Sequence, residues 1–293
     1  MHMKTQDKLY QFLFENTPLR GNLAHLNSTY NLALEHQHLP LVIKKALGEL
    51  MAASALLTST LKMDGALVLQ IQTKGQLKLL VVECHSNLEM RATAKWDGDV
   101  ADDADFITLI KNGHCIITLD PKDNKPYQGI VPIEGENIAA MLENYMLRSQ
   151  QIDTKLWLSC DGKSAAGMLL QKLPEQAAQD ADAWNRVTTL ADTVTDKELL
   201  TDSAEHIITK LFHEEDVRLF DPKALRFYCK CTREGVANML RMLGKDEVES
   251  ILTEQEKVEI HCDFCNKQYT FDAVDAATLF ASNTVAKASK AIH

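Results

Sequence analysis

The alternation of apolar and polar positions predicts a series of hairpins in the first 175 residues. Residues 39–65 are rich in Leu and Ala and end at Gly65, which predicts a helix. Residues 66–84 then form two strand-like runs on either side of Lys74-Gly75, a hairpin signal. The same reasoning predicts strands over 89–96 and 114–120. The turn-rich residues 121–129 lead into 130–135 and predict another hairpin. A helix over 136–150 follows, and then two strands around Asp161-Gly162. The predicted class is α+β, with a sandwich-like N-terminal domain (1–175) built on antiparallel sheets.

The pattern changes after Pro174, where charge and helical periodicity coincide. Between 175 and 221, twelve acidic residues stand against four basic ones, a balance of −8 (4 − 12) in a chain whose net charge is −10. Apolar residues nevertheless recur at helical spacings: Leu199, Leu200, Ile207, Ile208, Leu211 and Phe212. We interpret 176–225 as a marginally stable, amphipathic helical linker. The solvated helical face of an ordinary domain gives the same pattern, and the pattern alone does not separate the two.

A small C-terminal domain (226–293) is predicted to contain a helical region and a hairpin. Residues 232–252 have helical spacing, with Thr232 as a possible N-cap and Gly244 as a possible stop. Residues 257–271 predict a hairpin whose turn carries two cysteines. The tail 281–293 is small and polar and is expected to fray.

Composition and charge narrow the classes of function. A chain of 293 residues exceeds the usual limit of one core, which favours at least two domains. The net charge of −10 argues against a partner held by phosphate contacts, so no nucleic acid is expected. The sequence has no run of about 18 apolar residues, so no membrane span is predicted. The N-terminal residues do not resemble a secretory signal. We therefore expect a cytoplasmic protein. The sequence contains no P-loop, dinucleotide fingerprint or HExxH motif, so no enzyme activity or catalytic residue is expected.

Four of the seven cysteines are packed into two short stretches. Cys229 and Cys231 are one residue apart, and Cys262 and Cys265 have two residues between them. Two local turns that each supply a pair of thiolates are typical of a tetrahedral zinc site. Four thiolates leave no open position, so this pattern predicts one structural Zn²⁺ per chain. His261 could replace one thiol, but four cysteines already complete the shell.

The remaining cysteines, Cys84, Cys115 and Cys160, have no metal-ligand spacing. Each falls in a predicted strand, where a small buried hydrophobic residue is the expected role.

The same four thiols suggest redox chemistry. Zinc holds cysteines as thiolates, the form that oxidants attack, and oxidation to disulfides would release the ion. Structural zinc contributes an apparent ~10–16 kcal/mol in small metal-folded units, whereas whole domains are stable by ~5–15 kcal/mol. We therefore expect zinc loss to unfold the C-terminal domain and to loosen a linker packed against it.

These residues resemble the heat shock protein 33 family of redox-regulated bacterial chaperones. The resemblance is carried by "FYCKCTRE" and "IHCDFCNKQYTF", and also by "LYQFLFENTPLRG", "LLTSTLKMDG", "YMLRSQQ" and "SAAGMLLQKLP", so it covers nearly the whole chain. It implies a zinc-bound, poorly active reduced form with Cys229, Cys231, Cys262 and Cys265 as ligands. It also implies the disulfides Cys229–Cys231 and Cys262–Cys265 under oxidative stress, loss of zinc, and unfolding of the C-terminal domain and linker.

The resemblance further implies that the oxidised protein dimerises and holds unfolding client proteins without ATP. One position departs from the expected pattern: Gly235 stands where a charged residue is expected, at a cost of about 1 kcal/mol relative to Ala in a helix interior. We expect this to make the zinc domain slightly easier to unfold.

Two other classes of function remain open from the residues. One is a zinc-containing binding module without a redox role, and the other is a thiol oxidoreductase that uses Cys262 and Cys265. The oxidoreductase would need its CxxC at the start of a helix that follows a strand.

Overall fold

The computed structural model describes residues 7–173, 180 and 182–288, which form two compact units, Met1–Tyr228 and Cys229–His293. The first unit contains two sheets, called A and B here. Sheet A consists of β1 (Lys8–Phe14), β2 (Leu19–Leu26), β8 (Thr154–Cys160), β9 (Ala165–Lys172), β10 (Val217–Leu219) and β11 (Lys223–Ala224). Sheet B consists of β3 (Gly65–Gln72), β4 (Leu77–His85), β5 (Glu89–Trp96), β6 (His114–Pro121), β7 (Tyr127–Pro132) and β12 (Arg226–Phe227).

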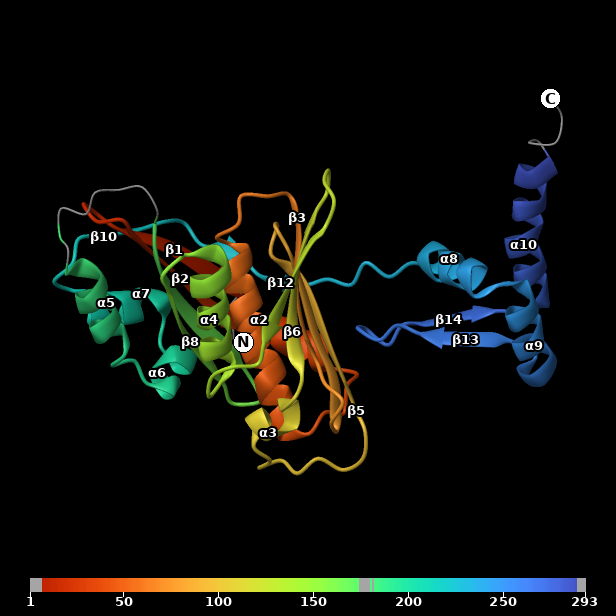
Figure 1. The fold of residues 1–293 in the computed structure, drawn as a ribbon, viewed down its shortest axis with the longest axis horizontal. Helices are drawn as coiled ribbons and strands as arrows, with labels where there is room; N and C mark the ends of the chain where they lie inside the picture. Colours follow the sequence, from red (N-terminus) through yellow and green to blue (C-terminus); the bar gives the residue numbers. More distant parts are fainter. Residues whose placement is uncertain (1–6, 174–179, 181, 289–293) are drawn as a thin grey trace, which may run out of the picture. The chain divides into compact units, whose positions relative to one another are not determined.

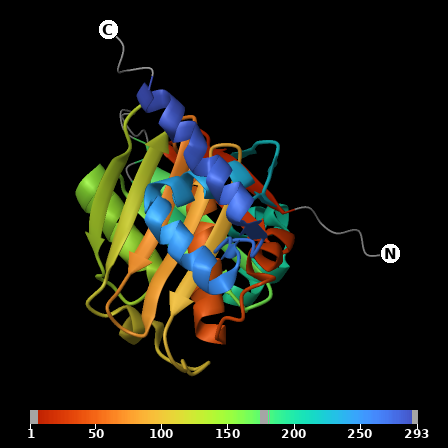
Figure 2. The same ribbon diagram turned by 90° about the vertical axis from the view of Figure 1, so that its right-hand side faces the viewer.

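The strand orders confirm an α+β fold with antiparallel sheets. Sheet A runs β10-β1-β2-β9-β8, with β11 also paired to β1, and sheet B runs β12-β5-β4-β3-β6-β7. All these pairs are antiparallel except β12 with β5. Figure 2 shows the orange and yellow strands of sheet B side by side. The predicted hairpins at 66–84, 114–132 and 154–172 are all present.

Helix α2 fills the space between the two sheets. The helices of this unit are α1 (Ser28–Leu34), α2 (Leu41–Thr58), α3 (Phe106–Ile110), α4 (Ile138–Gln150), α5 (Ala183–Ala191), α6 (Asp196–Thr201) and α7 (Ala204–Leu211). Fourteen of the eighteen residues of α2 are buried, and the helix contacts strands of both sheets (Figure 1). Such all-round burial is the pattern of a central core helix.

The helix ends at Thr58, earlier than the predicted Gly65. Gly65 is instead the first residue of β3, where an added Cβ would lie 2.3 Å from the Asp120 carbonyl oxygen on β6. The glycine therefore permits close approach of two strands and does not end a helix.

The acidic segment lies on the outer face of sheet A. Helices α5, α6 and α7 cover this face (Figure 1), and their apolar side chains join those of β1, β2 and β9 in a second core. Along β1, Leu9 points into the α2 core, whereas Tyr10, Phe12 and Phe14 point toward the acidic segment. This alternation follows from the period of two along a strand.

Within the described residues, the helical prediction for the acidic segment is correct from Ala183 to Leu211 and wrong beyond it. Residues 217–219 form β10, which pairs with the edge strand β1, and Lys223–Ala224 pairs with β1 as well. An edge strand offers unpaired backbone groups, and this stretch satisfies them. Glu175, and residues 176–179 and 181 of the predicted linker, lie outside the described residues. The separate role of 176–225 as a linker stays a prediction.

The second unit has a small core of its own. It contains α8 (Arg233–Leu243), α9 (Lys245–Gln255), β13 (Val258–His261), β14 (Gln268–Phe271) and α10 (Ala273–Ala288). As predicted, the Thr232 hydroxyl caps α8, and α8 stops at Gly244. Helix α10 extends through Ala288, which the sequence did not predict, and 289–293 lie outside the described residues. The fraying of the tail stays a prediction.

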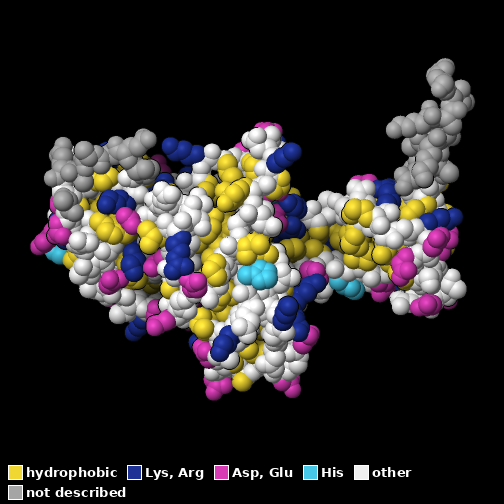
Figure 3. All heavy atoms as spheres, in the orientation of Figure 1, with side chains coloured by type: hydrophobic (Ala, Val, Ile, Leu, Met, Phe, Trp, Pro, Cys, Tyr) yellow, Lys and Arg dark blue, Asp and Glu magenta, His cyan; other side chains and the backbone are white. Residues whose placement is uncertain are grey.

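Much apolar surface of the second unit stays exposed. Met242 on α8 is 82% exposed, and Met239 and Leu243 are about half exposed. Figure 3 shows hydrophobic side chains over this helix. None of the helices in the described parts of the chain is long and apolar enough to cross a bilayer.

Replacing Phe212 with Ala should destabilise the first unit strongly. The ring is 2% exposed and lies 5.0 Å and 6.0 Å, centroid to centroid, from Phe14 and Phe12. A buried Phe→Ala change costs about 3–5 kcal/mol of unfolding free energy. Urea unfolding followed by tryptophan fluorescence measures this change. The control is Phe220→Ala, because Phe220 is 41% exposed and its truncation should cost far less. Equal losses in the two variants would contradict the packing described here.

Candidate metal centre

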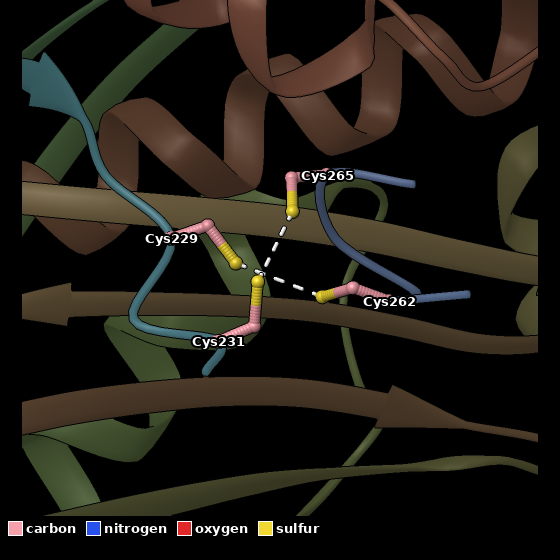
Figure 4. A group of neighbouring side chains, drawn as sticks. All are labelled: Cys229, Cys231, Cys262 and Cys265. Atoms are coloured by element: carbon pink, nitrogen blue, oxygen red, sulfur yellow. Dashed lines mark hydrogen bonds between the residues drawn. The ribbon is translucent and has the colours of Figure 1, made fainter. Parts of the chain in front are cut away.

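The first cysteine pair precedes helix α8. Cys229 and Cys231 lie in the irregular stretch between β12 and the Thr232 cap, separated by Lys230. The cap fixes where the helix begins, and so limits the path of the two residues before it. Figure 4 shows both sulfur atoms pointing toward the centre of the group.

The second pair lies in the turn between β13 and β14. The Cys262 N–H donates to the Lys267 carbonyl over 3.0 Å, and the Asn266 N–H donates to the Cys262 carbonyl over 2.8 Å. Asn266 has a φ of 53°, a left-handed conformation that asparagine tolerates better than most residues. These features curl the turn, and Figure 4 shows Cys262 and Cys265 aimed at the first pair. The predicted hairpin is therefore present.

The four sulfur atoms form one compact cluster. All lie within 4.8 Å of one another, with Cys229 Sγ 3.7 Å from Cys262 Sγ and Cys231 Sγ 3.4 Å from Cys265 Sγ. A tetrahedral ion with Zn–S bonds near 2.3 Å would place its sulfur ligands about 3.8 Å apart. A disulfide would need about 2.05 Å, and all four are free thiols. The spacing therefore fits four ligands of one zinc ion.

The electrostatics of the cluster favour a cation. Burial, together with its hydrogen bonds with Cys231, Cys229 and Cys262, raises the pKa of Cys265 to about 12. Four thiolates this close would repel one another strongly. A divalent ion at the centre reverses this balance and holds the ligands as thiolates. The donor set thus fits zinc, and the four thiolates complete its shell.

Two further side chains support the cluster. Tyr269 on β14 donates its hydroxyl to Cys231 Sγ over 3.2 Å. Arg233, at the start of α8, donates to the Thr270 carbonyl over 2.7 Å and pairs with Asp275 over 2.8 Å. Its guanidinium also lies 4.2 Å from the centre of the Phe271 ring. Arg233 therefore joins the helix that follows the first pair to the strand that follows the second. Sequence spacing gave no signal for either residue.

The remaining cysteines are buried in strands, as predicted. Burial raises the pKa of Cys84 and of Cys115 to about 12, and that of Cys160 to about 11. Such thiols are poor nucleophiles at neutral pH. The four clustered cysteines are each part-exposed, so small oxidants can reach them.

The neighbouring sequence candidates lie apart from the ligand set. His261 is exposed at the end of β13 and is not one of the clustered ligands. Cys262 and Cys265 lie in a hairpin turn, not at the start of a helix as a CxxC oxidoreductase would require. Gly235 lies in the first turn of α8, where its N–H donates to the Thr232 hydroxyl over 3.0 Å. Its effect on stability stays a prediction.

Comparisons with known proteins identify the family. A family model described as "Hsp33 protein" matches residues 7–272. A protein of Methylobacillus flagellatus named 33 kDa chaperonin is 57% identical over 99% of this chain and 100% of its own. One of the same name from Chromobacterium violaceum is 48% identical over the full length of both.

A solved structure extends the comparison to the fold. The crystal structure of 33 kDa chaperonin (heat shock protein 33 homolog) from Thermotoga maritima superposes with a TM-score of 0.83. It covers 96% of this chain and 100% of that one, at 19% identity. This likeness shows a shared fold.

Replacing Cys231 with Ser should abolish metal binding and the fold of the second unit. Three thiolates and a hydroxyl hold zinc poorly, and loss of a structural site removes the folding energy that the ion supplies. We expect less than a tenth of a zinc per chain by elemental analysis, with loss of amide chemical-shift dispersion for residues 229–288. Cys84→Ala is the matched control and should retain one zinc per chain. Full zinc content in Cys231→Ser would contradict the four-ligand site.

Proposed function

Since the chain belongs to the Hsp33 family, we propose that it is a redox-regulated, ATP-independent holdase chaperone whose switch is the four-cysteine cluster. The observation that carries the proposal is the cluster itself: four part-exposed sulfurs within 4.8 Å, on a small unit, at the spacing of a closed zinc site. The protein is proposed to act in the cytoplasm, where thiols are kept reduced until oxidative stress. In this proposal the protein binds unfolding client proteins and catalyses no reaction.

The proposed switch exchanges a metal for two disulfides. Cys229, Cys231, Cys262 and Cys265 hold one Zn²⁺ in the reduced, inactive form. Oxidation joins Cys229 to Cys231 and Cys262 to Cys265. Each disulfide forms when two thiolates give two electrons to hypochlorous acid, which is reduced to chloride and hydroxide. With its four ligands consumed, the ion leaves.

Loss of the ion should unfold the second unit. It is shorter than the roughly 70–80 residues below which one core rarely suffices, and the fully buried part of that core is small. The apparent ~10–16 kcal/mol from structural zinc exceeds what such a core supplies. The exposed Met and Leu side chains of α8 are consistent with a fold that depends on the metal.

Client binding is proposed to involve the acidic segment and the apolar surface that it covers. Helices α5, α6 and α7 hide aromatic side chains of sheet A and carry apolar faces of their own. When they loosen, both surfaces become available to unfolding proteins, and the acidic residues keep the opened chain in solution. The active form is proposed to be a homodimer. The net charge of −10 gives no support to a nucleic-acid partner.

Zinc content and aggregation suppression, measured together, test the switch. Reduced protein should hold about one zinc per chain and suppress client aggregation weakly. Protein treated with hypochlorous acid should have released zinc and should prevent aggregation. Treatment with dithiothreitol and zinc should restore the zinc-bound, weakly active state. Because dithiothreitol reduces disulfides but not methionine sulfoxide, this step separates thiol oxidation from methionine oxidation. Zinc retention, or zinc loss without client binding, would favour a structural binding module instead.

Replacing Leu200 with Ser should weaken client binding by the oxidised protein. Leu200 is a part-buried apolar residue of α6, packed at the border of the sheet A core. We expect a several-fold higher concentration of oxidised protein for half suppression of aggregation, with zinc content in the reduced form unchanged. Thr201→Ser, at the exposed neighbouring position, is the control. Equal suppression by the wild type and both variants would remove α6 from the binding surface.

A further inference from the structure

Tyr269 places a hydroxyl group against one member of the sulfur cluster. Its oxygen lies 3.2 Å from Cys231 Sγ, and the hydroxyl is the donor. The residue is only 5% exposed, although its phenol is polar. A buried hydroxyl needs a hydrogen-bond partner, and here the partner is a sulfur of the metal site.

The ring is held in place by its surroundings. Tyr269 lies opposite Ile260 in the β13–β14 ladder, and Phe271 lies two residues on, facing the same core. The Lys267 ammonium group lies 5.3 Å from the centre of the tyrosine ring. A nearby positive charge draws electron density from the phenol and makes its hydroxyl a better donor. The hydrogen bond therefore comes from a fixed side chain.

A hydrogen bond of this kind changes the chemistry of a thiolate. It stabilises the lone pairs of the sulfur, which favours the ionised ligand and lowers its nucleophilicity. Groups that hydrogen-bond to metal ligands orient them, and their loss typically costs about 10–100-fold in metal affinity. The tyrosine hydroxyl is directed at Cys231, so this cysteine has a donor that acts on its sulfur.

We propose that Tyr269 is a positioning residue of the metal centre, which holds Cys231 in ligand geometry and stabilises its thiolate through the hydroxyl. Tyr269 in this way raises metal affinity and makes Cys231 slower to react. It sets how readily the site gives up its ion. This inference rests on the proposed function, because it requires a metal bound by the four thiolates.

The test compares Tyr269→Phe with the wild type in the full chain, with Co²⁺ as a spectroscopic probe and Zn²⁺ for affinity. Phenylalanine keeps the buried ring and removes only the hydroxyl. We expect zinc affinity to fall by about 10–100-fold in competition with a chromogenic chelator. The sulfur-to-cobalt charge-transfer band should move to lower energy, because the lone pairs of Cys231 rise in energy without the donor. Tyr228→Phe is the control, since Tyr228 is half exposed and precedes the first ligand.

The outcomes separate this inference from the proposed function. If the wild type binds no Co²⁺ through four sulfurs, the metal centre itself is wrong, and the inference falls with it. If the wild type shows the band and Tyr269→Phe matches it in band energy and zinc affinity, only the role of Tyr269 is overturned. A purely structural role would lower affinity without moving the band.

A second substitution covers the case in which Tyr269→Phe does not fold around the metal. Incorporation of 3-fluorotyrosine at 269 keeps the shape of the side chain and strengthens the donor. At a pH where the phenol stays protonated, the charge-transfer band should move to higher energy. An unchanged band in this protein would overturn the inference.

Discussion

Four thiolate sulfur atoms within 4.8 Å of one another repel each other strongly, and a cation placed among them removes that repulsion. This constraint links the metal to the fold of the second unit. Cys229 and Cys231 precede α8, whereas Cys262 and Cys265 lie in the hairpin turn, so the ion would join two segments about thirty residues apart. Arg233 makes a second connection between the same segments through Thr270 and Asp275. An exposed ion pair contributes little by comparison with a structural metal.

The sequence was most informative where the signal is local. Ligand spacing identified all four clustered cysteines, and the hairpins of sheet B followed from alternation and turn residues. Strands β1 and β2 were not identified. In β1, apolar residues stand on both faces of the strand, so its sequence lacks the clean alternation of a half-buried strand. Strand β10 was missed because its extended form depends on the free edge of β1, a feature of tertiary structure. Tyr269 and Arg233 had no detectable pattern, since their partners are set by the fold of the second unit.

The acidic segment shows why composition alone left two interpretations open. Its charges lie on the solvent side, where Arg186 pairs with Glu215 and Asp180, while its apolar residues complete the core on sheet A. The acidic segment therefore has both features: its charged face is solvated, and its apolar face packs on sheet A. The pattern could not say what the apolar side covers. The structure identifies it as the aromatic face of β1, with Tyr10, Phe12 and Phe14.

The first unit has two separate cores, so one of them could be exposed while the other keeps its fold. The core around α2 uses the inner faces of both sheets, whereas the acidic segment packs on the outer face of sheet A. The ion pairs of the segment are part-exposed, and such pairs contribute about 0–1 kcal/mol each. Apolar contact, together with the pairing of β10 and β11 to β1, therefore holds the segment in place. Release of its helices would expose that apolar surface while leaving the α2 core packed, and this is the surface proposed above to bind unfolding clients.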